Sequence, residues 1–313
     1  MTKFRTPILF ITYNRPTETA QVLDRIRELK PQKLFIASDG PKPNKADREK
    51  LKEVRTIIEK AKSWNCSVEL LFQNENLGCK TAVSKAISWF FDHVEEGIIL
   101  EDDCLPDLSF FYLCDSLLEK YRYETKIMLI SGSNFQNGIQ RGNGSYYFSK
   151  YSAIWGWATW KRVWKDYDIN ISSFPDFKKD KIIQKIFSKK IEQLFWNYIF
   201  TNMHKGTRNT WDHQLAYTVM SRNGLSIVPN KNLVKNIGFN SASTRTTNSR
   251  HRLANMKTES IDVIIHPRFI IANHNADSYM FKHIYYPMII EQLIEILIKL
   301  PRHYVKKIFN NTK

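Results

Sequence analysis

The chain has 313 residues and a mass of 37.0 kDa, which is enough for one large domain or for a domain with an appendage. Its hydrophobic content of 42% and charged content of 25% are those of an ordinary globular protein, which excludes fibrous and low-complexity classes. With 47 Lys and Arg against 31 Asp and Glu, the net charge of +16 favours anionic partners: nucleic acid, an anionic membrane surface or phosphorylated substrates.

Cysteine usage and the apolar segments indicate the compartment. The four cysteines show no CxxC pair and no metal spacing, which predicts free thiols in a reducing environment. The apolar stretch near Met1 is too short for a signal peptide, and nothing approaches the length of a transmembrane span. The sequence therefore predicts a cytoplasmic protein. The cysteines are Cys66, Cys79, Cys104 and Cys114.

Apolar runs alternate with segments of helical spacing through the first hundred residues. The expected strands span 7–12, 33–37, 67–72 and 98–100; the expected helices span 18–29, a long segment through Ile57 and Ile58, and 81–91. Strands that alternate with helices at this spacing predict an α/β fold: a mainly parallel, Rossmann-like sheet flanked by crossover helices.

Charged side chains follow three of these strands. Arg15 follows the first, Asp39 the second, and an acidic cluster the fourth. Because ligands of parallel sheets sit beyond the carboxyl ends of the strands, this coincidence predicts a nucleotide site at that edge. The alternatives are an Arg15 that belongs to a capping loop and an Asp39 that lies on a solvated turn.

The acidic cluster consists of Glu101, Asp102 and Asp103, directly after Leu100 and before Pro106, which we expect to stop the strand. Adjacent carboxylates repel one another and resist desolvation, and a cation removes that conflict. Oxygen-only ligands suit Mg²⁺ or Mn²⁺, held jointly with nucleotide phosphates. The alternative is a solvated acidic turn that caps the following helix.

The second half of the chain is expected to continue with a strand at 126–131, after which Asn134 is placed to contact a sugar or an acceptor. A polar hairpin turn at 138–145 follows. The lysine-rich segment 178–200 has the pattern of a single amphipathic helix with a solvated basic face, and another helix begins at Thr210.

Four tryptophans lie close together in this half. We expect three of them to pack in the core and one to remain exposed, where its face is available to a sugar. They are Trp155, Trp157, Trp160 and Trp164.

The order of several motifs resembles that of nucleotide-sugar glycosyltransferases of the GT-A fold, over roughly residues 5 to 250. The likeness is greatest to the inverting N-acetylglucosaminyltransferase I type, whose Glu-Asp-Asp motif precedes a Pro-Asp-Phe-Phe helix; Cys104 and His213 differ from that pattern. The motifs here are Thr12-Tyr-Asn-Arg-Pro, Ser38-Asp-Gly, Asn74-Glu-Asn-Leu-Gly, Leu100-Glu-Asp-Asp-Cys-Leu-Pro-Asp-Leu-Ser-Phe-Phe, Trp155-Gly-Trp and Trp211-Asp-His-Gln.

The resemblance implies a role for each matching residue. Asp103 would bind the metal, while Glu101 and Asp102 would face the ribose and the base. Asp39 would contact the nucleoside, and Arg15 the uridine or the pyrophosphate, since its fork of donors suits phosphate. The residues implied to bind the nucleotide sugar are Thr12, Asn14, Arg15, Asp39, Asn76, Gly78, Lys80, Glu101, Asp102, Asn134 and Trp157.

Inverting transfer needs a group that takes the proton of the acceptor hydroxyl. Asp212 and His213 are the candidates, and the Trp-Asp motif favours Asp212. The alternative for Asp212 is a carboxylate that only faces the N-terminal end of a helix dipole.

Two segments near the C-terminus carry further expectations. The small, polar and basic stretch 237–252 is either a mobile loop that closes over a diphosphate or a linker. The amphipathic stretch 288–300, followed by Lys306 and Lys307, suits an interfacial helix on the inner face of the cell membrane. The alternative is a helix that packs on the domain or on a second subunit as a homodimer contact.

The sequence thus predicts a catalytic domain over 1–255, with a nucleotide-sugar half to about 107 and an acceptor half from 108, and a C-terminal helical extension over 256–313. The predicted function is a Mn²⁺- or Mg²⁺-dependent inverting glycosyltransferase. It would move a sugar from a nucleoside diphosphate sugar, UDP-linked by the resemblance, to a glycan or lipid-linked acceptor in surface polysaccharide or glycoconjugate synthesis.

Two alternatives remain from the sequence. A sugar-phosphate nucleotidyltransferase has a similar sheet, but it normally carries a glycine-rich phosphate loop after its first strand, and Tyr13-Asn-Arg-Pro lacks one. A nucleic-acid-binding protein is suggested by charge alone, and we do not expect nucleic acid as a partner.

Overall fold

The computed structural model describes residues 4–239 and 253–290. Its main sheet has eight strands in the order β3-β2-β1-β4-β8-β6-β9-β7, and β10 pairs with β5 in a small second sheet. The strands are β1 (Ile8–Thr12), β2 (Lys33–Ser38), β3 (Ser67–Phe72), β4 (Glu96–Glu101), β5 (Cys104–Pro106), β6 (Ile127–Ser131), β7 (Tyr146–Ser149), β8 (Trp157–Trp160), β9 (Leu225–Pro229) and β10 (Val234–Asn236).

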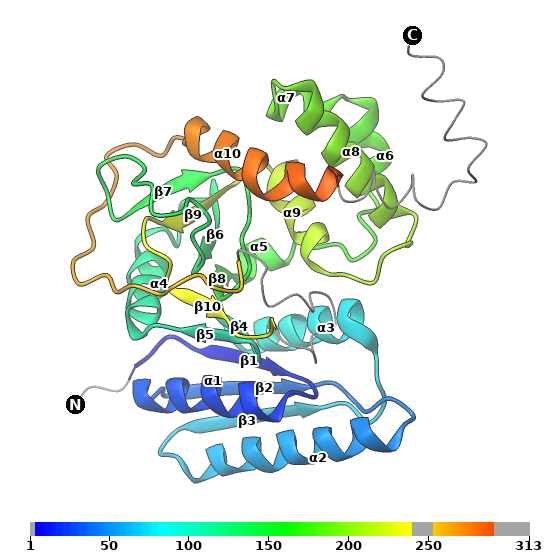
Figure 1. Ribbon diagram of the computed structural model, residues 1–313, viewed down its shortest axis with the longest axis vertical. Coiled ribbons are helices and arrows are strands. Elements are labelled where there is room, and N and C mark those ends of the chain that lie inside the picture. Colours follow the sequence, from blue (N-terminus) through cyan, green and yellow to red (C-terminus); the bar gives the residue numbers. More distant parts are fainter. Residues whose placement is uncertain (1–3, 240–252, 291–313) are drawn as a thin grey trace.

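Helices connect and cover these strands (Figure 1). They are α1 (Pro16–Leu29), α2 (Lys45–Glu59), α3 (Gly78–His93), α4 (Leu108–Lys120), α5 (Lys161–Trp164), α6 (Phe174–Lys179), α7 (Ile182–Ile186), α8 (Lys190–His204), α9 (Asp212–Ser221) and α10 (His274–Met280), with a 3₁₀ turn at Lys60–Ser63 and a π-helical turn at Phe281–Tyr285. The predicted α/β fold is confirmed: a large, mostly parallel sheet lies between helices.

The first four strands of the sheet are parallel because each returns through a helix. β1 pairs in parallel with β2 on one side and with β4 on the other, so that Ile8 lies level with Leu34 and Ile98. β8 and β7 run against the remaining six strands. All five residues of β1 are buried, as expected for a strand covered on both faces.

Alternate side chains of these strands enter two separate cores. Ile8 and Phe10 pack with α1, α2 and α4 on one face. Leu9 and Ile11 pack with α3 and with the tryptophans of β8, α5 and the start of α9 on the other. The result is a three-layer arrangement in which the carboxyl ends of β1, β2 and β4 open toward the N-terminal end of α3.

A third core lies beyond the end of the sheet. It joins side chains of α6, α7, α8 and α9 to Met280 at the end of α10 and to Phe281 in the π-helical turn that follows. Figure 1 shows these helices gathered at one end of the molecule. The prediction of one helix over 178–200 is wrong, because the chain forms parts of three helices there. Lys181 has a left-handed φ of 54° and Phe187 is extended, and each interrupts the helical hydrogen bonding.

The prediction that Pro106 stops the strand is also only partly right. The chain turns at Asp102–Asp103 and then forms β5, which ends at Pro106 and pairs with β10. Proline is tolerated there because β5 is a short edge strand. This pairing brings the chain near Gly238 beside the acidic cluster.

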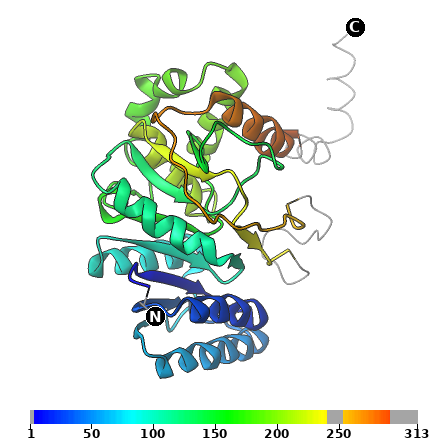
Figure 2. The same ribbon diagram turned by 90° about the vertical axis from the view of Figure 1, so that its left-hand side faces the viewer.

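Residues 256–272 run across the main body (Figure 2). Ser145 donates a backbone hydrogen bond to Ile265 beside the edge strand β7, and Asn273 donates one to Phe148 within it, at 2.8 Å each. Ile264 and Ile270 pack against the first core. This segment covers the edge of β7, which would otherwise present unpaired backbone groups.

Part of the predicted tail and loop lies outside the described residues: 240–252 of the cationic loop and 291–313 of the basic helix. Within the described residues, none of the helices combines the length and apolar character needed to cross a bilayer. All four cysteines carry free thiols, as predicted.

Candidate nucleotide-binding site

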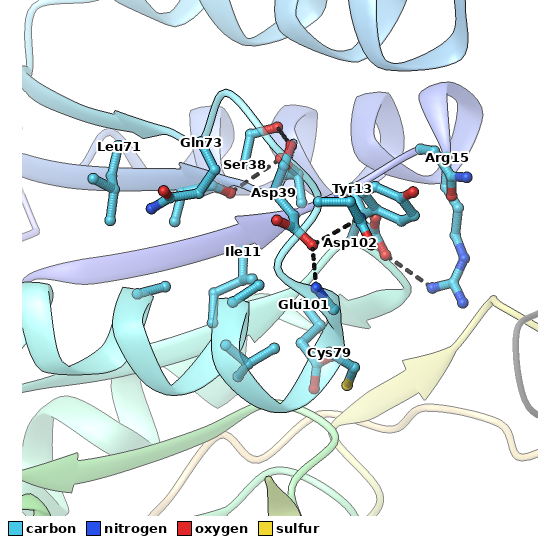
Figure 3. Close-up of a pocket in the computed structure, with 18 of the residues that line it drawn as sticks. Ile11, Tyr13, Arg15, Ser38, Asp39, Leu71, Gln73, Cys79, Glu101 and Asp102 are labelled. Carbon is cyan, nitrogen blue, oxygen red and sulfur yellow. Dashed lines mark hydrogen bonds and ion pairs between the residues drawn. The ribbon is translucent and has the colours of Figure 1, made fainter. Parts of the chain in front are cut away.

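A pocket of about 320 Å³ opens at the carboxyl ends of β1, β2 and β4 (Figure 3). It lies between the strand ends and the first turns of α3, the position at which open α/β sheets bind ligands. Its walls are formed by Ile11, Thr12, Tyr13, Asn14, Arg15, Ala37, Ser38, Asp39, Lys42, Leu71, Gln73, Asn76, Gly78, Cys79, Ala82, Val83, Ala86, Glu101, Asp102 and Asn209.

The inner part of the pocket is apolar and its mouth is charged. Ile11, Ala37 and Leu71 line it from the strands, and Ala82 and Ala86 line it from α3. Both α3 side chains are small, and we call the part of the pocket between them and these strand residues the apolar slot. Arg15, Lys42, Glu101 and Asp102 also line the pocket and carry the charge. An apolar slot with charged groups beside it suits a ligand with a flat ring at one end and phosphate at the other.

Asp39 organises the turn that leads into α3. Its carboxylate accepts hydrogen bonds from the backbone N–H groups of Gly40 and Leu77, at 2.8 and 2.9 Å, and of Gly78, at 3.2 Å. It also accepts one from Asn76 Nδ2 at 3.0 Å. Four donors fill the acceptor positions of one carboxylate. Asp39 therefore fixes the wall of the pocket, and the direct contact with a nucleoside that the resemblance implies for it stays a prediction.

A second carboxylate, Asp47, ties together three residues that line the pocket. It accepts hydrogen bonds from Tyr13 Oη at 2.8 Å, Asn14 Nδ2 at 2.6 Å and the Lys42 backbone N–H at 2.7 Å. Burial opposes the charge of this side chain, but the hydrogen bonds outweigh burial and lower the pKa of Asp47. The turn after β1 and the loop after β2 are thus tied to the start of α2.

The acidic cluster meets Arg15 at the mouth of the pocket. Arg15 Nη1 lies 2.9 Å from Asp102 Oδ1 and 2.6 Å from Asp103 Oδ2, so one guanidinium nitrogen bridges two carboxylates. Asp102 also accepts the Tyr13 backbone N–H at 3.0 Å (Figure 3). Burial raises the pKa of Asp102 to about 6, and repulsion from Asp103 adds to that shift while Arg15 opposes it.

The chain also approaches the cluster from behind. Ile237 donates its backbone N–H to the Asp103 carbonyl at 2.8 Å. A Cβ built on Gly238 would lie 2.6 Å from Asp103 Oδ2, so glycine is the residue that allows this approach.

The residues at the mouth fit a divalent cation that is held mainly by phosphate. Adjacent carboxylate oxygens of Asp102 and Asp103 are the hard ligands that Mg²⁺ prefers, and the guanidinium of Arg15 already occupies the place between them as a cation. Among the described residues, no three acidic, histidine or cysteine side chains gather closely enough to enclose a metal without a ligand.

The structure brings most of the predicted nucleotide-sugar residues together. Asp103 adjoins the pocket through Arg15, and Lys80 lies next to it, with its backbone N–H donated to Asn209 at 3.0 Å. The predicted residues that line the pocket are Thr12, Asn14, Arg15, Asp39, Asn76, Gly78, Glu101 and Asp102.

Asn134 and Trp157 lie apart from the pocket. Asn134 is buried, and its side chain donates to the Pro229 carbonyl at 2.6 Å and accepts from the Gln136 backbone. Trp157 is 1% exposed and stacks on Trp211. Trp155 is the one partly buried member of the tryptophan group and packs against the first core, so none of the four rings is fully exposed.

Asp212 and His213 also lie outside the pocket lining. Asp212 accepts hydrogen bonds from Thr210 Oγ1 and, at 2.9 Å, from the His213 backbone N–H at the start of α9. The His213 ring faces the edge of Trp196. The pocket reaches this segment only as far as Asn209.

The sequence did not indicate four residues that form or support the pocket: Tyr13, Lys42, Asp47 and Asn209. Tyr13 belongs to the motif Thr12-Tyr-Asn-Arg-Pro, but its neighbours carried the predicted roles. Asp47 looks in the sequence like an acidic first-turn residue of a helix, and Asn209 precedes the Trp-Asp motif by two residues. Only the folded chain shows that these two reach the strand ends.

The sequence matches no protein-family model and no curated protein. Solved structures match at low identity. UDP-glucose pyrophosphorylase in complex with UDP-glucose is 12% identical, with a TM-score of 0.38, over 72% of this chain and 89% of that chain. The inositol-1-phosphate CTP transferase from T. maritima is 8% identical, with a TM-score of 0.37, over 73% and 86%. HddC from Yersinia pseudotuberculosis is 12% identical, with a TM-score of 0.32, over 52% and 80%.

These findings correct the predicted function. The matching structures include a pyrophosphorylase and a CTP transferase, so the prediction of an inverting glycosyltransferase of the N-acetylglucosaminyltransferase I type is wrong. The motifs misled because they lie at strand ends. At strand ends they indicate where a ligand can bind, and they carry no information on which bond is broken.

Proposed function

We propose that this chain is an enzyme that binds a nucleoside phosphate in the pocket beyond β1, β2 and β4, and that it transfers a nucleotidyl group to a sugar phosphate. The observation that carries the proposal is the pairing, in one pocket, of an apolar slot beside α3 with a mouth that carries both a guanidinium and carboxylates. A nucleobase fits the first and a phosphate chain the second.

The apolar slot is suited to a nucleobase, and the turns around it are held in one conformation, which would fix the orientation of the bound base. Asp39 holds the turn before α3 mainly through backbone N–H groups, and Asp47 holds Tyr13, Asn14 and the Lys42 backbone, which supports a slot that is formed before a ligand arrives. A preformed slot spends less of the binding energy on ordering the protein.

At the mouth of the pocket, the phosphates of the ligand would be bound by side chains and not by a glycine-rich backbone loop. The turn after β1 has no glycine, so it lacks a backbone loop that wraps a phosphate. Arg15 precedes Pro16 at the start of α1, and in the described chain no side chain caps that helix end, where backbone N–H groups favour an anion. Arg15 and Lys42 add two positive charges beside it.

The proposed reaction needs no protein base. An oxygen of the sugar phosphate attacks the α-phosphorus of a nucleoside triphosphate, a new phosphorus–oxygen bond forms, and the bond to the β-phosphate breaks to release pyrophosphate. The nucleophile is already anionic near neutral pH, so the carboxylate at Asp212, predicted as a base for sugar transfer, has no proton to take. Cationic side chains stabilise the charge on the leaving pyrophosphate.

A Mg²⁺ ion, when bound, would supply further charge neutralisation at the phosphates. Asp103, with Asp102 beside it, would hold it. Arg15 would remain as the side chain that orients the phosphate chain by paired N–H donors.

Pyrophosphate release tests this proposal. The protein is incubated with Mg²⁺, each of UTP, CTP, dTTP and GTP, and a set of sugar 1-phosphates. We expect release that requires both substrates, and a fall of roughly a hundredfold or more in Asp103→Asn. Arg25→Met, which removes an exposed cation of α1 paired with Glu28, is the matched control and should keep the parent rate.

Release that never depends on the sugar phosphate would contradict nucleotidyl transfer. A rate in Asp103→Asn equal to that of the parent would remove Asp103 from the reaction.

A further inference from the structure

Arg15 occupies the place that a divalent cation would take. Its Nη1 atom lies within 2.9 Å of both Asp102 and Asp103, and only 13% of its side chain is exposed. A guanidinium and a metal ion cannot both sit between the same two oxygens. Whichever cation is present there excludes the other.

The two carboxylates are the fixed members of this group. Asp102 is 5% exposed and is held by the Tyr13 backbone N–H. Asp103 is backed by Gly238, with no room for even a methyl group between them, and its carbonyl is tied to Ile237. Neither can move far without displacing backbone.

Arg15 is the member that can change partner. It has a long side chain, it precedes the first turn of α1, and the pocket wall that it lines leads toward the apolar slot. Phosphate is a competing partner for a guanidinium because it accepts the same paired donors and carries more charge than one carboxylate.

We propose that Arg15 is a movable counter-cation: it pairs with Asp102 and Asp103 until nucleotide phosphates draw it away, and only then does the carboxylate pair accept a divalent cation. The inference rests on the proposed nucleotide site. It makes Arg15 the residue that couples the two ligands and sets their order, nucleotide first and cation second.

Opposite effects of one substitution follow from this exchange. Arg15→Gln keeps hydrogen-bond donors beside the carboxylates and removes the charge. The affinity of the ligand-free protein for Mn²⁺ should then rise by about ten- to a hundredfold, since a positive charge a few ångströms away no longer opposes the ion. The affinity for nucleoside diphosphate in EDTA should fall by about tenfold or more, because the phosphates lose a partner.

The measurements are Mn²⁺ binding by electron paramagnetic resonance, without nucleotide, and equilibrium dialysis of UDP, CDP, dTDP and GDP in EDTA. Arg25→Met is the control for loss of a positive charge on the same helix, and it should leave both affinities unchanged. A purely structural role for Arg15 predicts that Arg15→Gln weakens both ligands together.

A second comparison covers the case in which Arg15→Gln fails to fold because Asp102 is left charged and buried. Asp102→Asn and the double variant Arg15→Gln/Asp102→Asn repeat the test without that charge. The double variant should bind Mn²⁺ more tightly than Asp102→Asn alone.

Unchanged or weaker Mn²⁺ binding on loss of Arg15, in a protein that still binds nucleotide in EDTA, overturns the exchange and leaves the nucleotide site standing. Failure of the parent protein to bind any of the four nucleotides overturns the proposed function, and the exchange with it.

Discussion

Two carboxylates, the partly buried Asp39 and the buried Asp47, show how single residues shape this site through hydrogen bonds to the surrounding turns. Asp39 and Asp47 each accept several hydrogen bonds from the turns around the pocket, most of them from backbone N–H groups. Backbone donors are satisfied only when the turn has the right shape. Each of these carboxylates therefore selects the conformation of one wall of the pocket.

Asp39→Asn tests this role. The amide keeps one acceptor oxygen but turns a donor toward the groups that donate to Asp39 Oδ2, which are Gly78 N and Asn76 Nδ2. We expect the free energy of unfolding in urea to fall by about 1–3 kcal/mol. Nucleotide affinity should fall as well, since the start of α3 shifts.

The exposed Asp24→Asn on α1 is the matched control, and both quantities should stay within error of the parent. A stable Asp39→Asn protein that has lost nucleotide binding would instead indicate direct contact between Asp39 and the ligand.

Among the helices and strands, the sequence predicted those whose conformation is set by the local pattern of apolar residues. Buried apolar runs identified β1 to β4 within about two residues, and strand-end charges identified the edge of the sheet at which the pocket opens. It failed where tertiary contacts decide. Lys181 adopts a left-handed backbone with no glycine or proline to signal the break, and Trp157–Trp160 forms a strand although its aromatic side chains read only as core.

Helix α10 is anchored to the edge strand β7 through a buried carboxylate. Ser149 Oγ donates to Asp277 Oδ1 at 2.6 Å, and the Lys150 backbone N–H lies 3.4 Å from Oδ2. Burial raises the pKa of Asp277 to about 6 from a usual 3.8, although these hydrogen bonds and Lys150 oppose the shift. The folded chain thus holds the proton of this group more tightly than the unfolded chain does.

A raised pKa fixes the sign of the pH dependence. The contribution of Asp277 to the free energy of unfolding is fully present below about pH 4 and is lost as pH rises through about 6. The change is about 3 kcal/mol at most for two pKa units. Asp277→Asn does not titrate. The free energy of unfolding of this variant, relative to the parent, should therefore increase from pH 4 to pH 7 in urea titrations. A constant difference across this range would show that Asp277 titrates normally.

At the scale of the whole molecule, the pocket belongs almost entirely to the first hundred residues. Among the described residues that line it, Asn209 alone comes from the second half of the chain. Its side chain accepts the Lys80 backbone N–H and lies 3.0 Å from a Cβ built on Gly78, whose φ is +76°. The predicted division near residue 107 remains a prediction, and Asn209 is the point at which the second half contacts the nucleotide pocket.

The charge of the whole chain gives no reaction by itself. A net charge of +16 favours phosphorylated ligands in general, and the arrangement of Arg15 and the carboxylates is what makes one place specific. The sequence identified these side chains but not the reaction, because strand-end motifs indicate where a ligand can bind and not which bond is broken.

Ala82→Trp tests most directly whether a nucleotide binds in the slot beside α3. The new ring fills the slot from α3, while Lys85→Trp places the same ring on the exposed face of that helix. In equilibrium dialysis with labelled nucleoside triphosphates and Mg²⁺, Ala82→Trp should lose binding by a hundredfold or more, about 3 kcal/mol or more, while Lys85→Trp binds like the parent. Equal affinity in the folded Ala82→Trp protein and the parent would contradict binding in this slot and place the nucleotide elsewhere.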